Sequence, residues 1–243
     1  MSNIVEKINS ELKEAYKSRI AAANQAQSLK IISSDIYTEA ERFIFELIQN
    51  AVDSYVDTAE EILDIRMELR DGYLVFMHNG KAFADRDVEG ICGIGNGSKG
   101  DDAKKIGYKG IGFKSVFVHS NDVVISSGEH CFRFSESEWD NYEHKMPWQI
   151  IPIECNEPLC INDRSKYNVA TYIHLKRPLE IQHTIAALMS NSQFLLFLRC
   201  TDAVIRYVNK ESVLTLSKET RDNTIQLFSN GATDSVWLTH TTP

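Results

Sequence analysis

Residues Ile106–Phe117 read I-G-Y-K-G-I-G-F-K-S-V-F. Three glycines, Gly107, Gly110 and Gly112, lead directly into a run with the composition of a helix. Glycine lets backbone N–H groups approach an anion without an intervening side chain, and the N-terminus of the following helix adds partial positive charge. The stretch therefore predicts a phosphate site, although a glycine cluster by itself is weak support.

A helix predicted upstream, over Tyr37–Asp57, strengthens this interpretation. Four polar residues recur in it at helical spacing and share one narrow sector: Glu46, Asn50, Asp53 and Asp57. Such a face is by itself more often solvated than functional. The other sides of this helix are apolar, however, so it should be largely buried, and a buried amide or carboxylate needs a partner.

The spacing of Glu46 and Asn50 suits phosphate chemistry. Magnesium takes oxygen ligands and usually keeps several waters, so one oxygen from Asn50 together with phosphate oxygens would satisfy it. A carboxylate one turn earlier, on Glu46, could orient and deprotonate a water that faces the terminal phosphate. Such a general base contributes roughly 10²–10⁴-fold to a rate.

The two stretches together resemble one known family. E-L-I-Q-N-A-V-D at Glu46–Asp53 is similar to the N-box (E-x-x-x-N-A-x-D) of the Bergerat-fold ATPases, called GHKL, which include gyrase B subunits, the ninety-kilodalton heat-shock chaperones, histidine kinases and MutL. Ile106–Phe117 resembles the second glycine box of this family, closest to its chaperone-like and sacsin-like branches. Val169–Leu175 resembles the late strand that carries the family's threonine. The resemblance covers about Tyr37 to Leu198.

The resemblance implies that the chain binds ATP and Mg²⁺ and hydrolyses ATP. It makes Glu46 the general base, Asn50 the magnesium ligand and Asp53 a residue that holds the base helix and the nucleotide side. It also places backbone amides of the second glycine box on the phosphates and Thr171 in the adenine pocket. The residues that it assigns to nucleotide binding are Asn50, Asp53, His78, Asn79, Gly80, Lys99, Gly107, Lys109, Gly110, Ile111, Gly112, Phe113 and Thr171.

The glycine-, lysine- and aspartate-rich segment Gly93–Lys105 corresponds to the ATP lid of the family. Lys99, in G-N-G-S-K, resembles a lysine near the start of the lid in MutL-like members. For Lys99, as for Lys109 and Lys114, exposure to solvent is the more common state.

The first glycine box departs from the family pattern. Family members read D-x-G-x-G there, and the aspartate accepts a hydrogen bond from the adenine amino group. The matching stretch is His78-Asn79-Gly80-Lys81-Ala82, so histidine replaces the aspartate and alanine the second glycine. A neutral histidine nitrogen can accept one hydrogen bond, and Asn79 could supply another. The pattern leaves base selectivity open, and a packed histidine at a strand end is an equally good interpretation of His78.

The rest of the chain predicts helices and mostly antiparallel strands. An amphipathic helix is expected over Val5–Gln27, followed by a loop at Ser33–Asp35, and Asp71-Gly72 signals the turn of a hairpin between Ile62–Leu69 and Tyr73–Met77. Other helices are expected over Asp85–Ile91, Gly112–His119 and Leu179–Leu198, and other strands over Asp122–Ser126, Cys131–Phe134, Val169–Leu175, Ala203–Val208, Ser212–Leu216, Thr224–Phe228 and Val236–His240.

This order predicts an α+β fold, a Bergerat-type sandwich in which a mixed, mostly antiparallel sheet carries helices on one face. We expect residues 1–30 to form an N-terminal helical strap. Residues 31–243 would then form the ATP-binding domain, as the N-terminal part of a larger protein.

Composition narrows the class of protein. The chain has 243 residues and a net charge of −8, so this domain alone is a poor binder of nucleic acid. Its five cysteines are irregularly spaced, which disfavours a zinc site. No apolar run approaches the roughly 18–20 residues that span a bilayer, and the N-terminus lacks an apolar signal core. We therefore expect a cytoplasmic location and no membrane partner.

Four functions are compatible with these features. The first is an ATPase that drives a conformational switch in a larger protein, through contacts with downstream domains or through ATP-dependent formation of a homodimer. The second is a nucleotide-gated interaction module with little or no hydrolysis. A histidine kinase ranks low because Val5–Gln27 contains no phosphoacceptor histidine. An interaction domain without a ligand also ranks low, because two motifs coincide.

Overall fold

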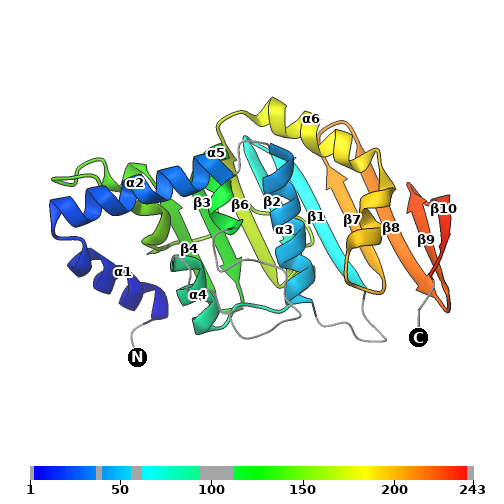
Figure 1. The fold of residues 1–243 in the computed structure, drawn as a ribbon, viewed down its shortest axis with the longest axis horizontal. Coiled ribbons are helices and arrows are strands. Elements are labelled where there is room, and N and C mark those ends of the chain that lie inside the picture. Colours follow the sequence, from blue (N-terminus) through cyan, green and yellow to red (C-terminus); the bar gives the residue numbers. More distant parts are fainter. Residues whose placement is uncertain (1–2, 37–39, 56–61, 94–111, 240–243) are drawn as a thin grey trace.

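The computed structural model describes residues 3–36, 40–55, 62–93 and 112–239. Their strands form one ten-stranded sheet in the order β10-β9-β8-β7-β1-β2-β6-β3-β4-β5, and the long helices cover one face of it (Figure 1). Neighbouring strands of this sheet run antiparallel except β1 and β7, which are parallel. The prediction of an α+β fold with a mixed, mostly antiparallel sheet is confirmed.

The strands are β1 (Leu63–Arg70), β2 (Tyr73–His78), β3 (Ser120–Ser127), β4 (His130–Ser135), β5 (Ile153–Glu154), β6 (Val169–Leu175), β7 (Ala203–Val208), β8 (Val213–Arg221), β9 (Thr224–Ser229) and β10 (Ala232–Leu238). The α-helices are α1 (Ile4–Ala15), α2 (Arg19–Ile36), α3 (Ala40–Ser54), α4 (Asp85–Cys92), α5 (Val116–His119) and α6 (Pro178–Met189). Short 3-10 helices include η1 (Gly112–Ser115), η3 (Trp148–Ile150) and η5 (Ser192–Phe197).

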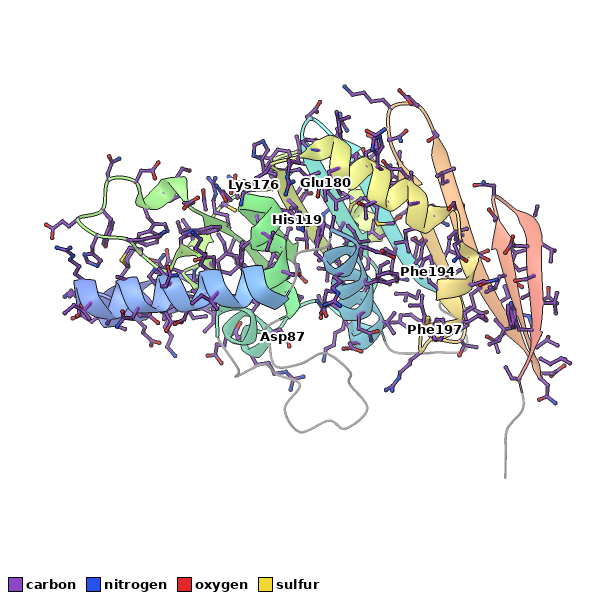
Figure 2. The ribbon with its side chains drawn as sticks, turned by 45° about the horizontal axis from the view of Figure 1, so that its top comes forward. Asp87, His119, Lys176, Glu180, Phe194 and Phe197 are labelled. Carbon is purple, nitrogen blue, oxygen red and sulfur yellow. The ribbon has the colours of Figure 1, made fainter. Side chains whose placement is uncertain are left out.

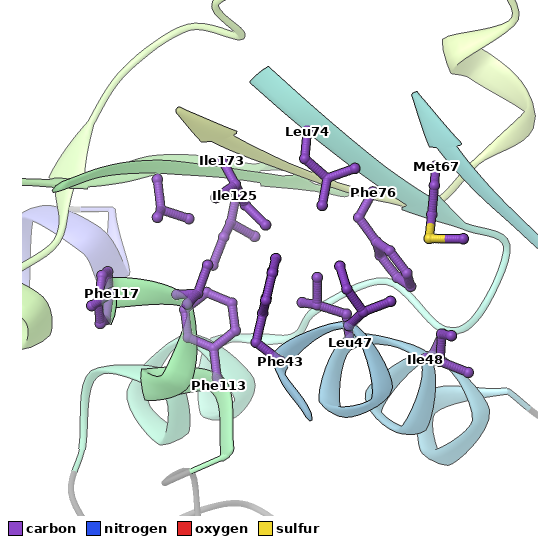
Figure 3. Packing of buried hydrophobic residues seen from close by; sticks show 14 of the residues in the cluster. Phe43, Leu47, Ile48, Met67, Leu74, Phe76, Phe113, Phe117, Ile125 and Ile173 are labelled. Atoms are coloured by element: carbon purple, nitrogen blue, oxygen red, sulfur yellow. The ribbon is translucent and has the colours of Figure 1, made fainter. Parts of the chain in front are cut away.

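Helix α3 is the centre of the helical layer, and its apolar face is buried against the sheet. Phe43, Leu47 and Ile48 project from it toward the sheet residues Phe76 and Ile125 (Figure 3). All five are at most 5% exposed. The helical periodicity of the sequence predicted this buried stripe, and the opposite sector carries the half-buried Glu46 and Asn50.

The β1–β2 hairpin forms where the sequence predicted it. Asp71 and Gly72 both have positive φ, 51° and 83°, as a tight two-residue turn between twisted strands requires. The register pairs Arg70 with Tyr73 and Ile65 with His78. His78 is therefore the last residue of β2, and the polypeptide leaves the sheet immediately after it.

The N-terminal region corrects the prediction of one helix over Val5–Gln27. The structure divides it into α1 and α2, because Ser18 begins a new helix: its carbonyl accepts from Ala22 N–H at 2.9 Å and its hydroxyl lies 3.5 Å from Ala21 N. The loop predicted at Ser33–Asp35 is also wrong, since α2 continues to Ile36. Buried residues of both helices join the same apolar core as α3.

The opposite face of the sheet is covered by polypeptide without long helices. A second apolar cluster there joins Met77 and Tyr172 of the sheet to Ile161 and Tyr167 of the segment between β5 and β6. Arg164 fastens this segment to the sheet by donating to Ser126 O at 3.2 Å and to the Glu157 carboxylate at 2.8 Å. The irregular stretch predicted over Met146–Ile161 divides between the two faces: its end joins this cover, whereas Met146, Trp148, Ile150 and Ile151 belong to the core on the helix-covered face.

The C-terminal strands extend the sheet beyond α6. Strands β8, β9 and β10 form an antiparallel meander, and β10 is the outermost strand of the sheet (Figure 1). The helical prediction over Leu179–Leu198 resolves into α6 followed by η5. Among the described residues, no helix has both the length and the apolar character that crossing a bilayer requires.

Candidate functional site

The Glu46 carboxylate lies directly against Gly112. A methyl group built on the Gly112 α-carbon would overlap Glu46 Oε2 and would lie 2.8 Å from its Cδ and 3.4 Å from its Oε1. Real Cβ atoms do not approach that closely, so any side chain at this position would displace the Glu46 carboxylate from its present place. Residues more than sixty positions apart thus meet, and both belong to the motifs that predicted a phosphate site.

The C-terminal end of α3 meets the turn that follows β2. Lys81 N–H donates to Ser54 O at 2.9 Å. A methyl group on Gly80 would overlap Ser54 Oγ and would lie 2.8 Å from His78 Nδ1. The surviving glycine of the first glycine box is therefore required by close packing against α3.

The hydrogen bonds of His78 define its protonation. The side chain is 5% exposed, and its Nδ1 accepts from Gly80 N–H at 3.2 Å. Burial lowers the pKa of His78 to about 3, so the ring is neutral at physiological pH. With Nδ1 as an acceptor, the remaining proton is on Nε2. One nitrogen thus closes the turn, and the other is an N–H donor.

Polar residues gather at one end of the helix-covered face of the sheet. Phe76 pairs with Thr171, which pairs with Ile125 on the far side of β6. His78 and Ser127 follow two residues beyond Phe76 and Ile125, so they share this face. Thr171 is 6% exposed, and Ser127 Oγ accepts from Phe83 N–H at 2.9 Å. The structure therefore brings Thr171 into the same row as Phe76, diagonal to His78.

The Asn79 side chain is engaged in bracing the strand end. Its amide nitrogen donates to Ile62 O at 2.8 Å, and its Oδ1 accepts from Asp64 N–H at 2.9 Å. The turn is held further by Asn168, whose Nδ2 donates to the carbonyls of Asn79 at 3.0 Å and Gly80 at 3.1 Å. The Asn79 side chain thus shapes the site by bonding backbone groups of the neighbouring strand end.

Sequence reasoning overlooked Ser54 and Asn168. Ser54 follows Asn50 by one helical turn, which places it at the end of α3 beside the turn after β2. This i, i+4 spacing from Asn50 could have identified Ser54 as a site residue from the sequence. Asn168 precedes β6 by one residue, and only the pairing of β6 with β2 reveals that it reaches Gly80.

Asp53 is held on its own helix, where its Oδ1 accepts from Gln49 Nε2 at 2.9 Å. Phe113 points into the core, 9% exposed, with its ring edge-on to Phe117 at 6.0 Å between centroids. The predicted site residues Lys99, Gly107, Lys109, Gly110 and Ile111 lie outside the described residues, as does most of the predicted lid.

Lys114 differs from the expectation of an exposed lysine, since only 1% of it is accessible. Lys176, in contrast, is exposed; it lies over the end of α5 and donates to Phe117 O and Val118 O at 3.2 Å each (Figure 2).

The donor set around α3 suits magnesium held chiefly by phosphate. Within the described residues, no three His, Cys, Asp or Glu side chains are close enough to hold a metal ion by themselves. Asn50 offers one amide oxygen on the half-buried sector of α3, one turn from Glu46. A magnesium ion that keeps its waters and phosphate oxygens needs no more protein oxygen than this.

Comparison with known proteins agrees with part of this picture. Residues 25–135 match the Sacsin domain, a stretch that includes Glu46, His78 and Gly112. The chain is similar to sacsin-like proteins. It is 35% identical to Sacsin of Homo sapiens over 105 residues, which are 38% of this chain and 2% of that protein. It is 28% identical to Protein NO VEIN of Arabidopsis thaliana over 236 residues, which are 89% of this chain and 8% of that protein.

These matches support the sacsin-like branch of the resemblance. The chain spans less than a tenth of the length of either relative. The match to Protein NO VEIN covers most of the chain, whereas the Sacsin domain match ends at residue 135, before β6 and Thr171.

Proposed function

We propose that this domain binds ATP with Mg²⁺ and hydrolyses ATP, and that the hydrolysis cycle drives a conformational switch in a larger protein. The contact between the Glu46 carboxylate and Gly112 is the observation that carries the proposal. It joins a candidate general base to a glycine segment that can bind phosphate through backbone N–H groups. The Sacsin domain match spans both of these residues.

Each residue has a separate task in this proposal. Glu46 accepts a proton from the attacking water. Gly112, without a side chain, leaves room for that carboxylate against the backbone of the glycine segment. Asn50 and the phosphate oxygens would hold Mg²⁺, which neutralises phosphate charge when bound. Thr171 and His78, which are diagonal to each other, lie at the polar end of the sheet, where a base edge would find hydrogen-bonding groups.

The test separates binding from hydrolysis. Replacing Glu46→Gln keeps the size of the side chain and removes the base, so turnover should fall roughly 10²–10⁴-fold. Binding of Mg²⁺-ATP should remain, and at a hundred times the Kd it raises stability by about 2.7 kcal/mol. The matched control is Glu41→Gln, an exposed carboxylate in the first turn of the same helix. Unchanged turnover in Glu46→Gln would remove Glu46 from the role of base.

A nucleotide-gated interaction module without hydrolysis is the second candidate. The hydrogen bond from Gly80 N–H to His78 Nδ1 favours it, because that nitrogen is no longer available to accept from a nucleobase. This candidate predicts a thermal shift with Mg²⁺-ATP, no release of phosphate from the wild-type protein, and identical behaviour of Glu46→Gln. Absence of any thermal shift with millimolar nucleotide would contradict both candidates.

A further inference from the structure

A buried lysine stands two residues after Gly112. Lys114 extends from η1 into the interior, where its Nζ donates to the carbonyls of Ile91 and, at 3.0 Å, of Gln149. The same Nζ lies 5.7 Å from the ring centroid of Phe117 and 5.4 Å from that of Phe134. Within the described part of the chain, no carboxylate forms a salt bridge with this ammonium group.

Such an arrangement carries an energetic cost. Removing an ammonium group from water without a counter-ion is unfavourable, and burial lowers the pKa of Lys114 to about 8. Carbonyl oxygens and the faces of two aromatic rings offset part of that cost. An apolar side chain of similar length would avoid this desolvation cost but would leave the carbonyls of Ile91 and Gln149 without this donor, so the bonds of the lysine, and not packing alone, account for it.

The bonds of Lys114 connect three separate elements. Ile91 belongs to the last turn of α4, where a cation also interacts favourably with the helix dipole. Gln149 belongs to η3. Lys114 itself is part of η1, in which Ser115 Oγ donates to Gly112 O at 2.7 Å. The lysine therefore fixes η1, and with it Gly112, relative to the end of α4.

We propose that Lys114 is a positioning residue for ATP hydrolysis, which holds Gly112 at contact distance from the Glu46 carboxylate. The inference rests on the proposed function. Lys114 does not touch the reacting groups, because its Nζ is directed toward Ile91 and Gln149. It acts on the reaction through the place of the backbone at Gly112, where a displacement of about 1 Å can cost 10²-fold in rate.

The chain provides a matched control in Lys218 of β8. This lysine is 5% exposed, and its Nζ donates to Leu198 O and Cys200 O at 2.8 Å each. Strands β7 and β1 separate β8 from β2, so its loss removes buried lysine–carbonyl bonds away from the Glu46–Gly112 contact. Lys114→Met and Lys218→Met therefore make the same chemical change in two places.

The experiment measures kcat and KM for Mg²⁺-ATP, urea unfolding, and hydrogen exchange of the peptide that follows Gly112. Both Met variants should lose stability. Only Lys114→Met should lose kcat, by roughly 10–100-fold with a smaller change in KM, and only it should exchange faster in that peptide. Lys114→Arg keeps the positive charge and the N–H donors, so its kcat should lie between those of the Met variant and the wild-type protein. If Lys114→Met does not fold, Lys114→Arg is the variant to be compared with the wild-type protein.

The outcomes separate the inference from the proposed function. Equal kcat in Lys114→Met and Lys218→Met, in a wild-type background that hydrolyses ATP, would overturn the positioning role and leave the ATPase intact. Lack of binding and turnover in the wild-type protein would overturn the proposed function, and the inference with it. Unchanged exchange after Gly112 in Lys114→Met would also overturn the inference, since η1 would then keep its place without the lysine.

Discussion

Acidification should weaken this domain through His78. The folded state keeps the ring neutral, because burial lowers the pKa of His78 to about 3, whereas a histidine in an unfolded chain has a pKa near 6.5. Below pH 6.5 the unfolded state therefore takes up a proton that the folded state refuses, and stability falls as the pH falls. Between pH 7.5 and pH 5 the loss from this residue is about 2 kcal/mol.

A substitution isolates the contribution of His78. In His78→Asn, the side-chain oxygen can accept from Gly80 N–H as Nδ1 does, but it does not titrate. The variant should be less stable at neutral pH, because a buried ring is lost. It should lose about 2 kcal/mol less than the wild-type protein between pH 7.5 and pH 5. Burial also lowers the pKa of His119, but that effect is common to both proteins.

Urea unfolding followed by tryptophan fluorescence at several pH values provides the measurement. The free energies of unfolding of the two proteins should converge as the pH falls from 6.5 toward 5. Parallel curves would show that His78 is accessible to protons in the folded state, and the assignment of a neutral ring with its proton on Nε2 would be lost.

Three further predictions concern single positions. Gly112→Ala should lower turnover by roughly 10–100-fold, because its methyl group overlaps the Glu46 carboxylate; normal kinetics would show that the contact is not needed. Gly72→Ala should cost about 1–2 kcal/mol in urea unfolding, since φ is 83° there, and a neutral result would contradict the turn. Cys131 and Cys155, with sulfurs 4.0 Å apart, should form a disulfide under mild peroxide, to be identified by peptide mapping; coupling of either to another cysteine instead would contradict their proximity.

The strongly periodic segments could be predicted from the sequence. The buried and polar sides of α3 follow from residue spacing, and the Asp71-Gly72 turn follows from its dipeptide. Both features depend only on residues that are close together in the sequence, and for that reason they could be predicted. The division between α1 and α2 was also local, but Ser18 is a weak signal within a run of good helix formers.

Features that depend on distant residues could not be predicted. Lys114 is buried because α4 and η3 present carbonyl groups to it, and neither is adjacent to it in the chain. The engagement of Asn79 requires the position of β1 beside β2. From the sequence, only the family resemblance placed Glu46 and Gly112 in one site. The contact between the two residues became evident from the fold.

The parallel pairing of β1 with β7 has a consequence during synthesis. Leu63 pairs with Ala203, about 140 residues later, and an ion pair joins Asp64 to Arg206 across the same seam. A ribosome adding roughly 5–20 residues per second needs many seconds to deliver β7 after β1 has emerged. Throughout that interval one edge of β1 has no neighbouring strand. An unpaired strand edge exposes backbone N–H and C=O groups, which can bind a chaperone or pair with another nascent chain.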